Sequence, residues 1–158
     1  MSRRILIADP HPAIARLLAR MLERLGYKPV VLDMRGVQSA SRGAQSASVQ
    51  PHGVRPTPAV LRSADALLIE PTMPGALALA RTARVANPAL AILGEGPSLP
   101  DRREWDRWLQ VAVPVGHLAK PFTSAQLDVL LQQGLAHGDA LRRDRAHHTN
   151  RTSSAGHR

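Results

Sequence analysis

The segment that decides the fold reads Leu67-Leu68-Ile69-Glu70-Pro71-Thr72-Met73-Pro74-Gly75. An apolar run that reaches an acid just before a proline-glycine turn is typical of a buried strand with a carboxylate at its end. Two further segments have a similar form, because one apolar run ends at Asp9 and another ends at Lys120. Each charge stands at the end of a predicted strand, so we expect the three side chains to share one pocket.

Helical and extended patterns alternate along the chain. After the first strand, apolar residues recur on one helical face at Ile14, Leu17, Leu18, Met21, Leu22 and Leu25. Short apolar runs predict further strands at 30–32, 66–69, 90–93 and 113–118, and helices are expected at 58–62, 76–85, 100–110 and after Thr123. This alternation predicts a doubly wound α/β fold in which helices cover both faces of a parallel sheet.

The 158 residues are enough for one domain, predicted at 3–137, and for irregular segments. From about 34 to 57 the chain is rich in serine, glycine, glutamine and alanine, so we expect a flexible insertion there. Residues 142–158 hold five arginines against one aspartate. We therefore expect 138–158 to be a basic, disordered C-terminal tail.

The net charge of +9 favours anionic partners without identifying one. The absence of cysteine excludes disulfides and thiolate metal sites. No apolar run has the roughly 18 residues needed to span a bilayer, and the first acid comes too early for a secretory signal. We expect a cytoplasmic protein without a membrane segment.

Motifs for common cofactors and for catalysis are missing. No glycine-rich dinucleotide turn follows the first strand, no P-loop is present, and no serine, histidine and acid surround a strand-to-helix elbow. The Asp9-x-His11 pair is similar to the opening of a cobalamin motif, but Ile14 stands where that motif needs glycine. The neighbouring His147 and His148 cannot converge on a metal in a disordered tail. We expect no enzymatic activity, no cofactor and no metal site.

Over residues 3 to 135 the chain resembles the receiver domains of bacterial two-component response regulators. The segment around Asp9 resembles the family's opening strand with its acidic pair, and the segment around Glu70 resembles its phosphoacceptor strand and turn. Leu-Ala-Lys-Pro-Phe at 118–122 resembles its lysine-proline signature. The resemblance implies a flavodoxin-like, five-stranded sheet of order 2-1-3-4-5 and a cis Lys120–Pro121 peptide.

The departures from this family predict a degenerate phosphoacceptor pocket made of Asp9, Pro10, Glu70, Gly94 and Lys120. Glu70 replaces the phosphorylatable aspartate and is one methylene longer, so an acyl phosphate there would be misplaced. Pro10 replaces the second acid, so Mg²⁺ binding is expected to be weak or absent. Gly94 or Gly96 replaces the family's threonine or serine, and His117 replaces its mobile aromatic, so both parts of the usual switch are missing.

The resemblance therefore predicts a phosphorylation-independent receiver protein that acts in signal transduction by binding another protein. The partner would be a signalling kinase, a regulator or a second copy of the chain. The expected interface is the face formed by the fourth and fifth strands, with His117, Trp105 and Trp108, because aromatic residues are favoured at interfaces. Glu70 would either imitate a phosphorylated residue or belong to a site kept only for folding.

Two alternatives remain open. In the first, the basic tail binds nucleic acid while the receiver-like body serves as a dimerisation scaffold. In the second, the protein is a conventional phosphorelay receiver that uses Glu70 or Asp9 as the acceptor.

Overall fold

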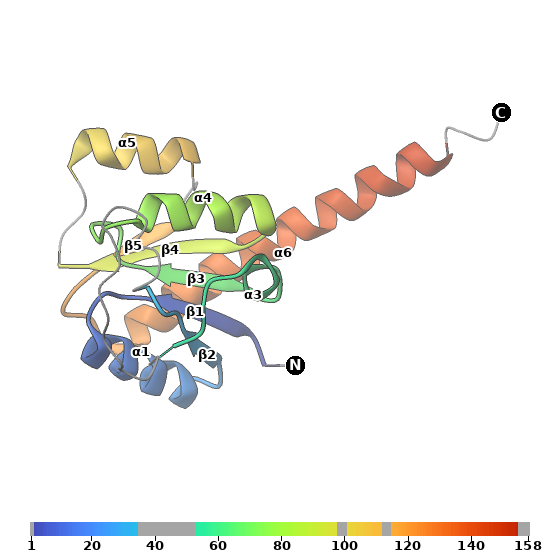
Figure 1. The fold of residues 1–158 in the computed structure, drawn as a ribbon. Coiled ribbons are helices and arrows are strands. Elements are labelled where there is room, and N and C mark those ends of the chain that lie inside the picture. Colours follow the sequence, from blue (N-terminus) through green and yellow to red (C-terminus); the bar gives the residue numbers. More distant parts are fainter. Residues whose placement is uncertain (1, 35–52, 98–100, 112–114, 155–158) are drawn as a thin grey trace.

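One parallel sheet forms the centre of the molecule (Figure 1). The computed structural model describes residues 2–34, 53–97, 101–111 and 115–154, so most of the expected flexible insertion lies outside the described residues. The strands are β1 (Arg4–Ala8), β2 (Lys28–Val31), β3 (Ala66–Ile69), β4 (Ala91–Gly96) and β5 (Gly116–Ala119). Their order is β2-β1-β3-β4-β5, which confirms the predicted doubly wound, flavodoxin-like arrangement.

Helices cover both faces of the sheet (Figure 1). One face packs against α1 (Pro12–Arg24) and α6 (Ser124–Ser154), and the other packs against α3 (Pro58–Arg62), α4 (Ala76–Ala86) and α5 (Arg102–Val111). The alternation of side chains along β1 explains this division, because Ile5 and Ile7 face the first pair of helices while Leu6 and Ala8 face the others. Among the described residues, no helix has the length and apolar character needed to cross a membrane.

Helix α6 corrects the expectation of a disordered C-terminal segment. It begins at Ser124 and continues to Ser154, and its last turns extend away from the sheet (Figure 1). No proline follows Gly138, and the residues from Ala140 to Ala146 are mostly good helix formers. The helix therefore continues past its last contact with the sheet.

The two glycines of α6 allow the helix to approach β4 closely. A Cβ atom on Gly138 would lie 2.6 Å from the carbonyl oxygen of Ala89, and one on Gly134 would lie 2.9 Å from Leu93 Cδ2. Glycine weakens a helix interior, but the close packing of α6 on the sheet leaves no room for a larger residue at either position.

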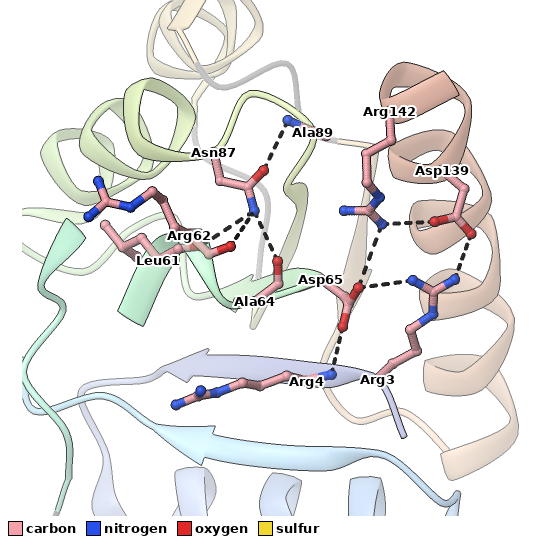
Figure 2. A network of polar contacts seen from close by, with 10 residues as sticks. All are labelled: Arg3, Arg4, Leu61, Arg62, Ala64, Asp65, Asn87, Ala89, Asp139 and Arg142. Carbon is pink, nitrogen blue, oxygen red and sulfur yellow. Dashed lines mark hydrogen bonds and ion pairs between the residues drawn. The ribbon is translucent and has the colours of Figure 1, made fainter. Parts of the chain in front are cut away.

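A polar network fixes α6 to the amino end of the sheet (Figure 2). The Arg3 guanidinium contacts Asp65 Oδ1 at 2.9 Å and Asp139 Oδ2 at 2.7 Å. Arg142 completes the set with a 2.8 Å contact to Asp139 Oδ1 and a 3.6 Å contact to Asp65 Oδ1. We call these four residues the amino-end network, and they hold α6 to the residues that directly precede β1 and β3.

Candidate functional site

The register of three strands brings three acids together at the carboxyl end of the sheet. Ala8 pairs with Ile69, and Ile69 pairs with Gly94. The residues that follow this row are Asp9, Glu70 and Glu95, which therefore stand side by side. All three are buried.

Lys120 follows β5 and reaches all three carboxylates. Its Nζ donates a hydrogen bond to Asp9 Oδ2 at 2.7 Å. It also forms ion pairs with Glu95 Oε2 at 2.6 Å and Glu70 Oε2 at 3.7 Å. We call Asp9, Glu70, Glu95 and Lys120 the carboxyl-end cluster. The Lys120–Pro121 peptide is cis, as the resemblance implied.

The other oxygens of Asp9 and Glu70 have local partners. Asp9 Oδ1 accepts a 2.7 Å hydrogen bond from the His11 backbone N–H, and the His11 Nδ1 atom lies 3.4 Å from the same oxygen. Glu70 Oε1 accepts a 2.9 Å hydrogen bond from the Thr72 hydroxyl, which belongs to the turn before α4. Gly75 closes that turn with φ of 82°, a conformation that favours glycine. The turns after β1 and β3 thus orient the two acids.

Glu95 is the most strongly perturbed member of the cluster. Its side chain is fully buried, and neither of its carboxylate oxygens has a hydrogen-bond donor with acceptable geometry among the described residues. The contact with Lys120 is therefore an ion pair by distance without hydrogen-bond alignment. Burial raises the pKa of Glu95 to about 7, although Lys120 opposes this shift and the nearby Asp9 adds to it.

Lys120 remains the cation of the cluster in spite of its burial. Burial alone lowers the pKa of the ammonium group, but the hydrogen bond to Asp9 and the negative charges of Asp9 and Glu95 outweigh burial and raise it above its ordinary value. With all four groups ionised, three negative charges face one positive charge.

Gly94 does not line this pocket, which corrects the expectation that it belongs to the degenerate phosphoacceptor pocket. Adjacent residues of a strand point to opposite faces, so Gly94 faces α5, and a Cβ atom there would lie 2.9 Å from His117 Cδ2. The missing side chain makes room for the His117 ring, which meets Trp105 edge-on at 6.4 Å between centroids. Burial and the charge of Lys120 lower the pKa of His117.

The two tryptophans have different environments. Trp108 is 1% exposed and packs in the core between the sheet and α4, so the expectation that it lies on an interface is wrong. Trp105 is partly buried against the same core. Trp105 and Trp108 lie three positions apart on the amphipathic helix α5. The rotation of this helix about its axis decides which of the two is buried more deeply.

The sequence reasoning missed Glu95 and gave no structural role to His11. A signal for Glu95 was present, because Leu68-Ile69-Glu70 and Leu93-Gly94-Glu95 both place a glutamate at the carboxyl end of an apolar run. Aligning the two segments by their final acid places Glu95 beside Glu70. No comparable signal existed for His11, since the position of its ring depends on the turn that leads into α1.

The residues of the pocket do not fit Mg²⁺, the ion that the resemblance implies. Mg²⁺ requires near-octahedral oxygen coordination, and Pro10 supplies no side-chain oxygen. In addition, the Lys120 ammonium lies 2.7 Å from Asp9 Oδ2, where it takes one of the oxygens that such an ion would need.

Several solved structures with a similar fold are receiver domains. The chain has a TM-score of 0.64 and 15% identity to a CheY-like response regulator receiver domain protein from Methanospirillum hungatei JF-1, covering 89% of this chain and 98% of that one. It has a TM-score of 0.63 and 16% identity to the signal receiver domain of an HD domain-containing protein from Pseudomonas fluorescens Pf-5, covering 89% and 99%. The signal receiver domain of a modulated diguanylate cyclase from Desulfovibrio desulfuricans G20 has a TM-score of 0.64 and 20% identity to this chain. The match covers 89% of this chain and 98% of that one.

These likenesses establish the receiver fold. No protein-family model and no curated protein matches the sequence. Because one fold serves many tasks, the function must be argued from the site.

Proposed function

We propose that this chain is a receiver-fold protein of two-component signalling that acts by binding a protein partner and does not accept a phosphoryl group. The observation that carries the proposal is the contact set of Lys120. Its ammonium is held by Asp9 at 2.7 Å and by Glu95 at 2.6 Å, so two buried carboxylates already surround the cation.

The position of Glu70 supports the same conclusion. Its nearer oxygen lies 3.7 Å from Lys120, and its other oxygen accepts the Thr72 hydrogen bond. A phosphoryl group on Glu70 would need cations to offset its charge, yet it would meet Asp9 and Glu95. Constant negative charge at this position is also what a permanently active signalling conformation needs, and we favour that reading over a site kept only for folding.

Phosphoryl acceptance can be tested by intact-mass measurement. The protein is incubated with acetyl phosphate and Mg²⁺, and a receiver domain known to be phosphorylated serves as the positive control. We expect no added phosphoryl mass on this chain. An acid-stable or labile phosphoryl adduct that disappears in Glu70→Gln or Asp9→Asn would instead support the conventional phosphorelay function.

We place the partner surface at the edge strand β5 and the adjoining face of α6. An apolar groove there is lined by Leu118, Ala125, Gln126, Val129, Leu130 and Gln133. Val129 is 56% exposed at the groove, although an apolar side chain gains free energy when it leaves water. Leu118 of β5 lines the groove and Lys120 directly follows that strand, so the backbone connects the groove to the carboxyl-end cluster.

The surface can be tested with a matched pair of variants. Val129→Glu places a charge in the groove, while Val85→Glu places one on α4, where the side chain is 79% exposed. The binding assay is affinity capture from the source cells followed by mass spectrometry, with self-association measured by sedimentation. We expect Val129→Glu to lose the captured partner or dimer and Val85→Glu to retain it. Equal behaviour of the two variants would contradict this surface.

Glu70→Gln tests whether the pocket charge matters for binding. The variant keeps the size of the side chain and its contact with Thr72, but it removes the charge. We expect partner affinity to fall by roughly tenfold, as typical coupling between two sites allows. Unchanged affinity together with unchanged stability would show that Glu70 has no signalling role.

A second candidate function is nucleic-acid binding by the projecting end of α6. Arg143 and His147 are exposed on this part of the helix, and the chain carries a net charge of +9. Binding to random duplex DNA should then weaken steeply as salt increases, because phosphate contacts release counterions. Truncation after Arg142, which keeps the amino-end network, should abolish that binding. Salt-insensitive binding, or binding that survives truncation, would remove this candidate.

A further inference from the structure

Exposed positive charge gathers on one layer of the molecule. Helices α1 and α6 pack on the same face of the sheet, and the last turns of α6 extend away from it (Figure 1). In the described part of these two helices the exposed arginines are Arg16, Arg20, Arg24, Arg143 and Arg145. The exposed acids there are Glu23 and Asp144. This layer therefore presents an excess of positive charge to solvent.

The arginines of α1 form a row without counter-charges. Arg16, Arg20 and Arg24 follow one another at intervals of four residues, so they share one side of the helix. No described residue forms an ion pair or a hydrogen bond with any of these three side chains. We call these three residues the α1 ridge. Like charges four residues apart destabilise a helix, so α1 would be more stable without the ridge.

The α1 ridge leads to the point at which α6 leaves the body. The ridge ends at Arg24, and the exposed Lys28 begins β2. The Lys28 backbone N–H donates a 2.8 Å hydrogen bond to the Arg3 carbonyl oxygen. The Arg3 guanidinium in turn lies 2.7 Å from Asp139 Oδ2 of α6. A single residue therefore connects the start of β2 to the base of the projecting helix.

Arginines on the other face of the sheet have a different arrangement. Helix α5 and the residue before it hold three arginines interspersed with three acids, which are Arg102, Arg103, Arg107, Asp101, Glu104 and Asp106. Helices α3 and α4 each carry one exposed arginine, Arg62 and Arg81. An exposed row of arginines without acids on the same side is therefore a feature of α1.

The dimensions of the α1 ridge fit a polyanion with closely spaced charges. Arg16 and Arg24 are eight residues apart in the helix, which corresponds to about 12 Å along its axis. Each strand of duplex DNA carries one phosphate per roughly 3.4 Å of its axis. The ridge therefore spans several phosphates of one strand.

The side chains needed for two other anionic partners are scarce. Proteins bind single-stranded nucleic acid with exposed aromatic side chains that stack on the bases. None of the four aromatic residues of the chain is exposed, and these are Tyr27, Trp105, Trp108 and Phe122. Helices on a membrane surface insert apolar side chains among the lipids. Leu17 is the one large apolar residue exposed in α1 and in the described residues 143–147 of α6.

We propose that the α1 ridge, Lys28 and the part of α6 after Arg142 form one surface that binds the phosphate backbone of duplex nucleic acid. This inference rests on the second candidate function above and extends its binding surface from α6 to α1 and β2. Contacts of arginine and lysine with phosphates position a protein on a duplex but carry no sequence information. We therefore expect affinity that depends strongly on salt and little on base sequence.

Two double variants separate a local surface from net charge. Arg20→Gln/Arg24→Gln removes two charges from the ridge, and Arg62→Gln/Arg81→Gln removes two from the opposite face. Binding of the full-length proteins to a random-sequence DNA duplex is measured by fluorescence anisotropy at several salt concentrations. For the ridge variant we expect the slope of log affinity against log salt to fall by about 2, with affinity at least about tenfold lower near 0.1 M salt. The control variant should retain the wild-type slope.

The outcomes distinguish this inference from the functions proposed above. Equal losses in the two double variants would show that net charge alone drives binding, and a wild-type protein that does not bind the duplex would also overturn the proposal. If truncation after Arg142 abolishes binding while Arg20→Gln/Arg24→Gln binds normally, the second candidate function stands and the α1 ridge has no part in it. Urea denaturation is the folding control, and we expect both double variants to be as stable as the wild type because all four side chains are exposed. Protein-partner capture tests the leading function separately.

Three competitors identify the ligand. Unlabelled duplex DNA, single-stranded DNA of the same length and phosphatidylserine vesicles compete with the labelled duplex at equal phosphate concentration. We expect the duplex to displace the probe, and the other two to displace it at least about tenfold less effectively. Equal or stronger competition by vesicles would assign the surface to an anionic membrane, and the same result with the single strand would contradict duplex recognition.

Discussion

The two ends of the sheet carry charge clusters of opposite design. At the amino end, Arg3 and Arg142 face Asp65 and Asp139, so two cations meet two anions (Figure 2). These side chains are between 23% and 40% exposed. At the carboxyl end, three buried acids meet one lysine. The charges of the first cluster balance and its side chains are partly exposed to solvent. The second cluster has excess negative charge, and its three acids are buried.

This difference separates a structural network from the cluster that we propose to be functional. Balanced ion pairs near water each contribute little, and their role here is to fix α6 to the residues that precede β1 and β3. A buried cluster with excess negative charge has a cost that folding alone does not require, since apolar residues of similar volume are often as stable or more so. Perturbed groups at the carboxyl ends of parallel strands therefore indicate a functional site.

The largest expected effect comes from removing the one cation of the carboxyl-end cluster. Lys120→Met leaves three buried carboxylates without a cation and should lower the free energy of unfolding by roughly 3 to 5 kcal/mol at pH 8. Urea denaturation measures the loss. Arg3→Met is the matched control at the amino end and should cost about 1 kcal/mol or less, because Arg3 is partly exposed. Equal losses would break the comparison between the two ends.

The next effect is a pH dependence that belongs to Glu95. Its pKa is raised to about 7 in the folded protein, against an ordinary value of 4.5. Its contribution to stability is therefore complete below the unfolded pKa and is lost as pH rises through about 7. The wild type should lose roughly 2 to 3 kcal/mol of unfolding free energy between pH 5 and pH 8 relative to Glu95→Gln. Parallel stability curves for the two proteins would contradict the assignment.

A smaller effect with the opposite sign is expected at the amino end. The hydrogen bond from Arg142 and the charge of Arg3 lower the pKa of Asp139. Its contribution is therefore present above the unfolded pKa and is lost as pH falls through the lower folded value. Asp139→Asn should cost about 0.5 to 1 kcal/mol at pH 7 and nothing in strong acid, as measured by urea denaturation. A loss that persists in acid would show that packing, and not charge, explains the effect.

The smallest effect should follow removal of the projecting part of α6. Residues 143–147 are exposed, so truncation after Arg142 removes few contacts with the body. We expect the free energy of unfolding, measured by urea denaturation, to change by less than about 0.5 kcal/mol. A loss above about 1 kcal/mol would mean that this segment packs on the domain.

Most of the fold follows from local patterns in the sequence. The strand ends at Asp9, Glu70 and Lys120 were predicted because apolar runs and turn residues mark them locally. Two features were not predictable in this way. Helix α6 tolerates Gly134 and Gly138 because these glycines fit against Leu93 and Ala89, and that is a tertiary contact. The burial of Trp108 depends on the rotation of α5 about its axis, which the sequence pattern alone does not fix.

The site was only half predictable for a related reason. Strand order groups Asp9 with Glu70, but which residue of Leu93-Gly94-Glu95 faces Lys120 depends on a register of one residue. A shift of the register by one position places Glu95, with its buried carboxylate, in the pocket in place of Gly94, which has no side chain. The same shift changes the expected site from a simple ion pair into a cluster with excess negative charge.

The central claim is that a buried acid at the end of β4 completes an unbalanced cluster around Lys120. Carbon-13 NMR of the side-chain carboxyl of Glu95 tests this claim most directly, with Glu95→Gln identifying the resonance. The account predicts a titration midpoint near 7, well above that of an ordinary glutamate. A midpoint near 4.5 would place Glu95 in water and contradict the account.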